Sequence, residues 1–258
     1  NSLQSNTSGA YNTALGSNAL QANTTANYNT AVGYQALYSN TTGANNVALG
    51  SLAMNKNNNG CNNFAAGRVA LYGNCFGSNN FAQGYQAMYG NTTGTSNIAI
   101  GYFAIRCGVY SSNSIAIGKH SLARNNGVYN YAIGAYGLCS VTTGNYNIAI
   151  GCSSLCTNCT GNNNIAFGPS SLLSNTIGSN NFAVGYGALK SNTTGCNNFA
   201  VGYQALQTNS TGDSNTAVGY RALNKSTGTN CTAIGYLAAY TTTSGANNNA
   251  MGTQALYL

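Results

Sequence analysis

Few side chains in this 258-residue sequence could take part in acid–base or metal chemistry. There is one acidic residue, Asp213, and one histidine, His120, and the two lie 93 positions apart. Hydrolysis by paired carboxylates needs two acids, and a Ser-His-Asp triad needs three groups that meet. Metal sites built on histidine or carboxylate need several such ligands together. We therefore expect no enzymatic activity, no metal and no cofactor.

Nine cysteines are the other reactive side chains, and their odd number leaves at least one free thiol or an intermolecular bond. Cys139 and Cys156 are separated by 17 residues, which is the repeat length described below, so they fall at equivalent places in neighbouring repeats. That placement suits a disulfide if the two side chains turn together. Cys156 and Cys159 form an isolated C-x-x-C, and small buried fillers are the default for the rest.

The eight basic residues are scattered along the sequence, without a run of Lys or Arg. A nucleic-acid groove needs clustered cations. We interpret these residues as solubilising surface charges and expect no nucleic-acid partner. No hydrophobic stretch approaches the ~20 residues of a membrane span, so we expect no membrane insertion of this segment.

A repeat of 17 residues organises the whole chain. The glycine of an Ala-x-Gly motif, called the marker glycine here, recurs 15 times, with a spacing of 17 that falls to 16 twice. Alanine stands two residues before the marker in all 15 copies, and asparagine stands four residues before it in 13. A helix pair needs roughly 33 residues, so a 17-residue unit predicts one rung of a β-solenoid.

The pattern therefore predicts an all-β, parallel β-solenoid of about 15 rungs, as a single repeat domain over residues 1–258. We expect each rung to hold a strand, a bend at the marker, a second short strand such as residues 34–37, and a polar loop. The sequence begins and ends in mid-pattern, so we expect a fragment of a longer rod or fibre. The expected bend glycines include Gly33, Gly50, Gly101, Gly151 and Gly202.

The strand before the marker has two kinds of face. The residues one and three before the marker are mostly apolar and share one face, while the unbroken alanine column points to the other. A column that is alanine in every copy indicates either tight packing inside a thin solenoid or a closely packed subunit interface. We favour the subunit interface. The alanines of this interface or core ladder include Ala31, Ala48, Ala99, Ala149, Ala200 and Ala217.

Two polar or aromatic columns are expected to form ladders along the stack. The asparagines four before the marker should hydrogen-bond from rung to rung. Tyrosine follows the marker on four consecutive rungs, at Tyr186, Tyr203, Tyr220 and Tyr236. Such an aromatic ladder either binds sugar rings or, as we favour, stiffens the solenoid or fills an interface.

Nine N-x-S/T sequons occur, and seven of them fall in one column of the polar loop. We expect this column to face solvent and to carry N-linked glycans if the chain passes through a glycosylating compartment. The seven candidate sites are Asn6, Asn23, Asn40, Asn91, Asn158, Asn192 and Asn209.

The repeat resembles the head repeats of trimeric autotransporter adhesins. The resemblance rests on N-I-A-I-G at 97–101 and 147–151, S-I-A-I-G at 114–118 and N-T-A-V-G-Y-Q-A-L at 29–37. Similar repeats of longer period occur in phage and giant-virus fibre proteins. The resemblance covers essentially the whole chain and implies a left-handed β-roll, three chains side by side, and a rigid surface rod that adheres or spaces. The period of 17 and the nine cysteines depart from the adhesin pattern.

From the pattern and the resemblance together we expect a structural surface fibre or adhesin rod. It would be a homotrimer outside the cell, on the cell surface or on a virion, with a host-surface protein or glycan as partner. Its weak contacts would add up by avidity. The alternatives are a self-stacking extracellular filament subunit, glycosylated or not, and a carbohydrate-binding or ice-binding solenoid. An ice-binding solenoid needs a regular threonine column, and in this chain Phe and Ile interrupt the threonines three residues before the marker.

Overall fold

The computed structural model describes residues 1–257. It divides into two compact units, residues 1–129 and a second unit that begins at Asn130. No helix occurs within the described residues, and each unit is built from strands of three residues joined by turns. Both units are parallel β-solenoids in which one repeat forms one rung.

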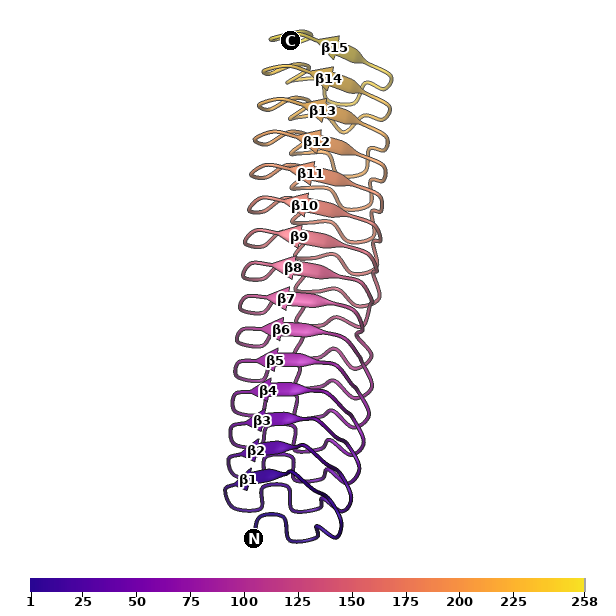
Figure 1. Ribbon diagram of the computed structural model, residues 1–258. Helices are drawn as coiled ribbons and strands as arrows, with labels where there is room; N and C mark the ends of the chain where they lie inside the picture. The colour runs from indigo at the N-terminus through magenta and orange to yellow at the C-terminus, as the bar shows by residue number, and fades with distance from the viewer. Residues whose placement is uncertain (258) are drawn as a thin grey trace. The chain divides into compact units, whose positions relative to one another are not determined.

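Each rung contributes one strand, and the strands of a unit stack in sequence order (Figure 1). The strands of the first unit are β1 (Thr13–Leu15), β2 (Thr30–Val32), β3 (Val47–Leu49), β4 (Phe64–Ala66), β5 (Phe81–Gln83), β6 (Ile98–Ile100) and β7 (Ile115–Ile117). Those of the second are β8 (Tyr131–Ile133), β9 (Ile148–Ile150), β10 (Ile165–Phe167), β11 (Phe182–Val184), β12 (Phe199–Val201), β13 (Thr216–Val218), β14 (Thr232–Ile234) and β15 (Asn249–Met251).

The strands pair in parallel with a register of one repeat. Ala31 of β2 lies opposite Ala48 of β3, so each column of the repeat becomes a line of equivalent side chains. The N–H of Thr30 donates to the carbonyl of Asn46 on the next rung at 2.8 Å, and the N–H of Gly33 donates to Leu15 on the previous rung at 2.8 Å. The predicted all-β parallel solenoid with a 17-residue period is confirmed in both units.

The marker glycines form the bends, as predicted. At Gly151 the φ angle is +132°, and an added Cβ would lie 2.7 Å from the carbonyl carbon of Gly168 on the next rung. A side chain would therefore meet both a disfavoured backbone conformation and a neighbouring main chain. The other predicted bends have similar φ angles, +134° at Gly33, +131° at Gly50, +134° at Gly101 and +133° at Gly202.

The second short strand predicted after the bend is wrong. The six residues that follow a marker are called the turn segment here, and after every marker from Gly16 to Gly235 they form a continuous turn, so residues 34–37 contain no strand. Gln35 and Leu37 both have a φ angle of +50°, a left-handed conformation that costs roughly 1–2 kcal/mol in a residue with a side chain. The same conformation lets the N–H of Leu37 donate to Ala53 on the next rung at 3.0 Å and buries its side chain completely.

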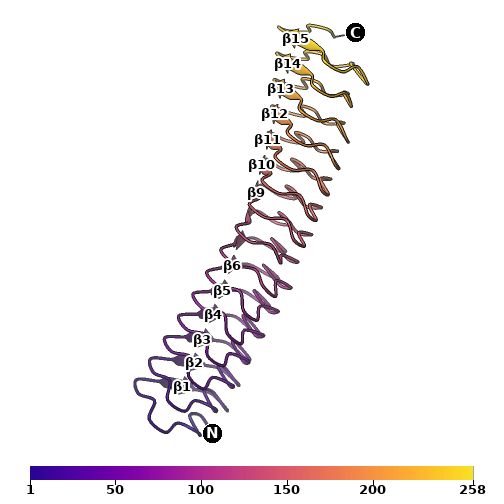
Figure 2. The same ribbon diagram turned by 90° about the vertical axis from the view of Figure 1, so that its right-hand side faces the viewer.

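The core is a narrow column inside the rungs. Three lines fill it: the alanines two before the marker, small residues three after it, and the leucine column four after it, whose members from Leu20 to Leu206 are among the largest fully buried side chains. Asparagines complete the interior, as described below. Figure 2 shows that the strands of each unit line one side of its rungs, so that they present a sheet outward.

Candidate interaction surfaces

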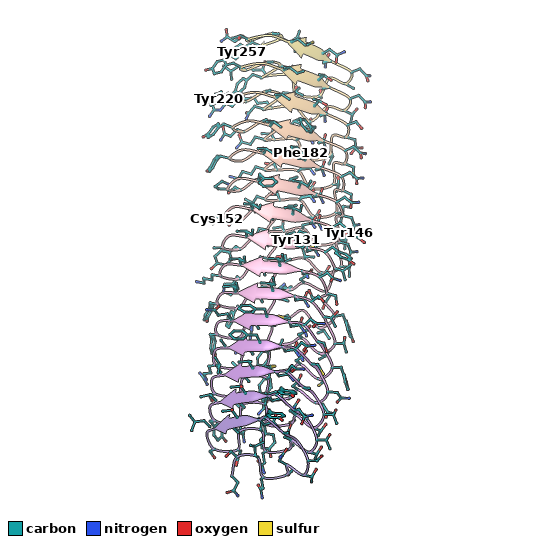
Figure 3. The ribbon with its side chains drawn as sticks, in the orientation of Figure 1. Tyr131, Tyr146, Cys152, Phe182, Tyr220 and Tyr257 are labelled. Atoms are coloured by element: carbon teal, nitrogen blue, oxygen red, sulfur yellow. The ribbon has the colours of Figure 1, made fainter. Side chains whose placement is uncertain are left out.

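An apolar sheet surface, called the strand face here, runs along each unit. It consists of the outward side chains one and three residues before each marker, which are half-buried or exposed on every strand. In β9 these are Ile148 and Ile150, and in β12 they are Phe199 and Val201. Phe182 and Phe199 stack on this face with ring centroids 4.9 Å apart. Tyr131 and Phe182 mark its position in Figure 3.

No charged side chain occurs on the strand face of β1 to β15. Large contiguous apolar surfaces are rare on monomeric soluble proteins and mark interaction sites. Most of the outward side chains are apolar, and such a sheet can bury them against a similar flat surface without a charge to desolvate. The polar exceptions are Thr13, Thr30, Gln83, Thr216, Thr232 and Asn249. The strand face is therefore the surface of this chain that is best suited to association with another protein surface.

The interpretation of the alanine column as a subunit interface is wrong. The side chains of Ala31, Ala48, Ala99, Ala149, Ala200 and Ala217 are all 0% exposed and lie in the core of their rungs. The other reading, tight packing inside a thin solenoid, is confirmed. Because these side chains are completely buried in a close-packed core, a larger side chain in this column would have to displace its neighbours.

The predicted tyrosine ladder is confirmed as a stack. The rings of Tyr186, Tyr203, Tyr220 and Tyr236 follow one another with centroids 5.4, 5.3 and 5.3 Å apart and interplanar angles of 14°, 8° and 13°. Tyr220 marks the ladder at the edge of the second unit in Figure 3. Each inner ring is covered on both faces by its neighbours, so the ladder presents ring edges and hydroxyls to solvent. This geometry leaves no open ring face between rungs on which a sugar could stack.

Asparagines form two hydrogen-bonded ladders inside the rungs. In the strand ladder, four residues before the marker, the Oδ1 of Asn164 accepts from the backbone N–H of Asn181 at 3.0 Å and from its Nδ2 at 3.1 Å. In the loop ladder, seven residues after the marker, the Nδ2 of Asn40 donates to the Oδ1 of Asn23 at 3.1 Å and to the carbonyl of Gly43 at 2.9 Å. The strand ladder was predicted, whereas the loop ladder was not.

The loop ladder contradicts the predicted glycosylation. Six of the seven candidate asparagines are 0% exposed, and Asn6 is half-buried. Their amide nitrogens donate within the solenoid; that of Asn192, for example, donates to Asn175 at 2.7 Å and to Gly195 at 2.9 Å. A glycan on the six buried nitrogens is incompatible with the fold. The prediction is therefore wrong for Asn23, Asn40, Asn91, Asn158, Asn192 and Asn209, and it stays a prediction for the half-buried Asn6.

The loop ladder stops where its column loses asparagine. The buried Oδ1 atoms of Asn91 and Asn209 accept no hydrogen bond. On the following rungs, the position that would supply the Nδ2 donor is occupied by Gly108 and Ser226 respectively. These two oxygens therefore carry the cost of burial without a partner, which is about 1–3 kcal/mol for such a group.

The predicted Cys139–Cys156 disulfide is absent, because all nine cysteines are free thiols. The two thiols nevertheless interact across neighbouring rungs. A hydrogen bond with Cys139, together with burial, raises the pKa of the Cys156 thiol above its ordinary value. The nearby thiol of Cys152 adds to this upward shift of the pKa.

The acid–base residues are dispersed between the units, with His120 in the first and Asp213 in the second. Burial, with Lys119 and Arg106 nearby, lowers the pKa of His120. Residues 1–257 contain no group of three His, Cys, Asp or Glu side chains arranged to hold a metal, and no cavity. Within the same residues, no helix has the length and apolar character needed to cross a membrane.

No protein-family model matches the chain, and no curated protein sequence matches it.

The sequence predicts the two faces of the strand correctly, but the alanine face lies inside the solenoid and the apolar face lies outside. Alternation shows that a strand has two faces, but not which of them lies inside. The size of the side chains is the missing signal. A column that is alanine in every copy fits a narrow interior, whereas a column that varies among Thr, Val, Ile, Phe and Tyr has room to vary because it faces outward.

Proposed function

We propose that this chain is a structural, non-catalytic module of a surface fibre or adhesin, and that it assembles with copies of itself through the strand face. The apolar strand face without charges is the observation that carries this proposal. The remaining surface of each rung stays open for attachment. Repetition keeps that open surface in register along a unit, so that individually weak contacts add up.

The adhesin-like repeat supports a homotrimer located outside the cell or on a virion. Three copies that turn their strand faces toward one another would bury the Ile, Val and Phe columns in a shared apolar core. Burying such side chains is worth roughly 1.5–3 kcal/mol each when complete, and each rung offers one or two of them. Even partial burial along a unit therefore exceeds what ordering three chains costs.

The experiment compares two double lysine variants on the same rungs. Ile148→Lys with Ile165→Lys places two charges on the strand face. Ser153→Lys with Ser170→Lys adds the same charge to half-buried turn-segment positions, in the column where Arg221 stands on another rung. Light scattering gives the solution mass of each, and circular dichroism confirms that each is folded.

We expect the unmodified chain and the serine double variant to share a mass of several chains of 26.4 kDa, three by the adhesin resemblance. The isoleucine double variant should have the mass of one chain, since a buried uncompensated charge is strongly unfavourable. A single-chain mass for the unmodified protein would overturn the proposal. So would an isoleucine variant that stays assembled. Threads of indefinite mass would show that the chain forms an end-to-end filament instead of a closed assembly through the strand face.

A further inference from the structure

The cations that look scattered in the sequence share one segment of the rung. All eight stand one, two, five or six residues after a marker glycine, in the turn segment, and none stands on a strand or in the polar loop. They are Lys56, Arg68, Arg106, Lys119, Arg124, Lys190, Arg221 and Lys225. The folded units therefore have an uncharged strand face and a basic turn surface.

In the first unit, four consecutive rungs place a cation, two tyrosines and a cation in one column. Arg68 lies over the ring of Tyr85 at 5.8 Å, the rings of Tyr85 and Tyr102 stack at 5.5 Å, and Lys119 lies over Tyr102 at 5.9 Å. These are cation–π distances. The contacts make a continuous line from Arg68 to Lys119.

A second pair of side chains widens this line. Arg106 lies over the ring of Phe103 at 4.5 Å, and that ring is 4.0 Å from the ring of Tyr102. The Nε of Arg106 donates to the Oε1 of Gln86 at 2.8 Å, which holds the guanidinium beside the column. We call Arg68, Tyr85, Tyr102, Phe103, Arg106 and Lys119 the basic–aromatic cluster.

The charge of the cluster has no acidic counterpart in its own unit. The one acidic residue of the chain, Asp213, belongs to the second unit, and five of the eight cations belong to the first. Burial is the main cause of the lowered pKa of His120, and the smaller contributions of Lys119 and Arg106 to that shift agree with a positive local potential. Uncompensated positive surfaces attract anionic partners over a Debye length.

We propose that the basic–aromatic cluster binds an acidic polysaccharide, whose carboxylate or sulfate groups pair with Arg68, Arg106 and Lys119. This inference rests on the proposed function, since it names the partner to which an assembled fibre would attach. Guanidinium groups form the two-pronged hydrogen bonds that such anions accept. Hydroxyls at the tyrosine ring edges would meet the hydroxyls of the sugar chain.

The ring geometry favours a polysaccharide over a nucleic acid. Single-stranded nucleic acids bind by stacking bases on open aromatic faces. Here Arg68 and Tyr102 flank the ring of Tyr85 within stacking distance, and Tyr85 and Lys119 flank that of Tyr102. The edges of these rings, rather than their faces, are left for a ligand.

The test measures the affinity of the full chain for heparin fragments of defined length, with a poly(dT) oligonucleotide of equal charge beside it. One variant carries Arg68→Gln, Arg106→Gln and Lys119→Gln. The matched control carries Lys190→Gln, Arg221→Gln and Lys225→Gln, which removes the same charge from the second unit. Thermal melting confirms folding of both, and light scattering gives their masses.

We expect heparin to bind the unmodified chain more tightly than poly(dT). The cluster variant should bind heparin roughly tenfold or more weakly, while the control stays within about threefold of the unmodified chain. Equal losses in both variants would overturn the cluster as a site, and equal or tighter poly(dT) binding would overturn the assignment to a polysaccharide. A chain that assembles but binds no heparin refutes this inference alone, whereas a chain that binds heparin as a monomer refutes the strand-face assembly alone.

Discussion

Single side chains decide where the loop ladder continues and where it stops. The Oδ1 of Asn209 is buried without a donor because the next rung has Ser226 in the ladder column. The other 16-residue rung shows that the shortened loop accepts asparagine there, since the Nδ2 of Asn125 donates to Gly127 at 3.0 Å. We therefore predict that Ser226→Asn stabilises the protein by about 1 kcal/mol, by giving the Asn209 oxygen its partner. Urea denaturation measures the change.

The control for this prediction is Ser226→Ala, which removes the hydroxyl without adding a donor that reaches Asn209. It should leave the protein no more stable than the unmodified chain. If Ser226→Asn lowers the unfolding midpoint, the Asn209 oxygen does not lack a hydrogen bond that asparagine at this position can supply, and the prediction is wrong.

A bend glycine tolerates no side chain where another rung lies above it. We predict that Gly151→Ala lowers the free energy of unfolding by about 3 kcal/mol, because it adds a clash with Gly168 to an unfavourable φ angle. Gly252 offers the matched control. Its φ angle is +115°, but an added Cβ would have nothing within 4 Å, so Gly252→Ala should cost clearly less. Equal losses in the two variants' denaturation midpoints would show that the contact between rungs does not matter.

At the scale of the element, the strand and its bend were predictable because each repeats one local rule. Glycine at the marker, alternation before it and asparagine at a fixed place are all visible by comparing copies such as residues 29–37 and 198–206. Their stacking follows from in-register pairing of equal columns. The stack of Tyr186, Tyr203, Tyr220 and Tyr236 was predictable for the same reason, because all four stand directly after a marker glycine.

The turn segment and the loop were less predictable, because burial overrides residue preference there. Leu37 has a left-handed backbone that leucine disfavours, and its burial and its hydrogen bond to the next rung compensate. Asn40 and Asn192 stand in a polar stretch that is typical of surface loops, yet their amides lie inside. Nothing local to S-N-T-T-G shows that the asparagine side chain turns inward, since this depends on the ladder partner one rung away.

Neighbouring rungs also set the reactivity of equivalent side chains. Because the pKa of the Cys156 thiol is raised through its hydrogen bond with Cys139, less thiolate is present at any given pH. We predict slow alkylation of Cys156 by iodoacetamide at pH 8, followed by mass spectrometry, and faster alkylation in Cys139→Ala. The exposed Cys107 serves as the internal reference and should react equally in both proteins. An unchanged rate at Cys156 would refute the coupling between rungs.

At the scale of the whole molecule, the repeat separates two surfaces with different chemistry. Apolar columns one and three before the marker make the strand face, and cations and tyrosines after the marker make the turn surface. Each rung adds the same pair of surfaces in the same orientation within its unit. We propose that the strand face is covered by other copies of the chain while the turn surface remains open for attachment.

The most direct test of this account is hydroxyl-radical footprinting of the unmodified protein in solution. Tyr131 on the strand face and Tyr136 on the turn segment belong to the same rung, and their exposed fractions in the single chain are 36% and 37%. Phe199 and Tyr203 form a second pair, at 41% each. The account predicts that Tyr131 and Phe199 are oxidised several-fold more slowly than their partners, after correction for the intrinsic reactivity of each residue type. Equal oxidation within both pairs would show that the strand face is open in solution and would contradict assembly through it.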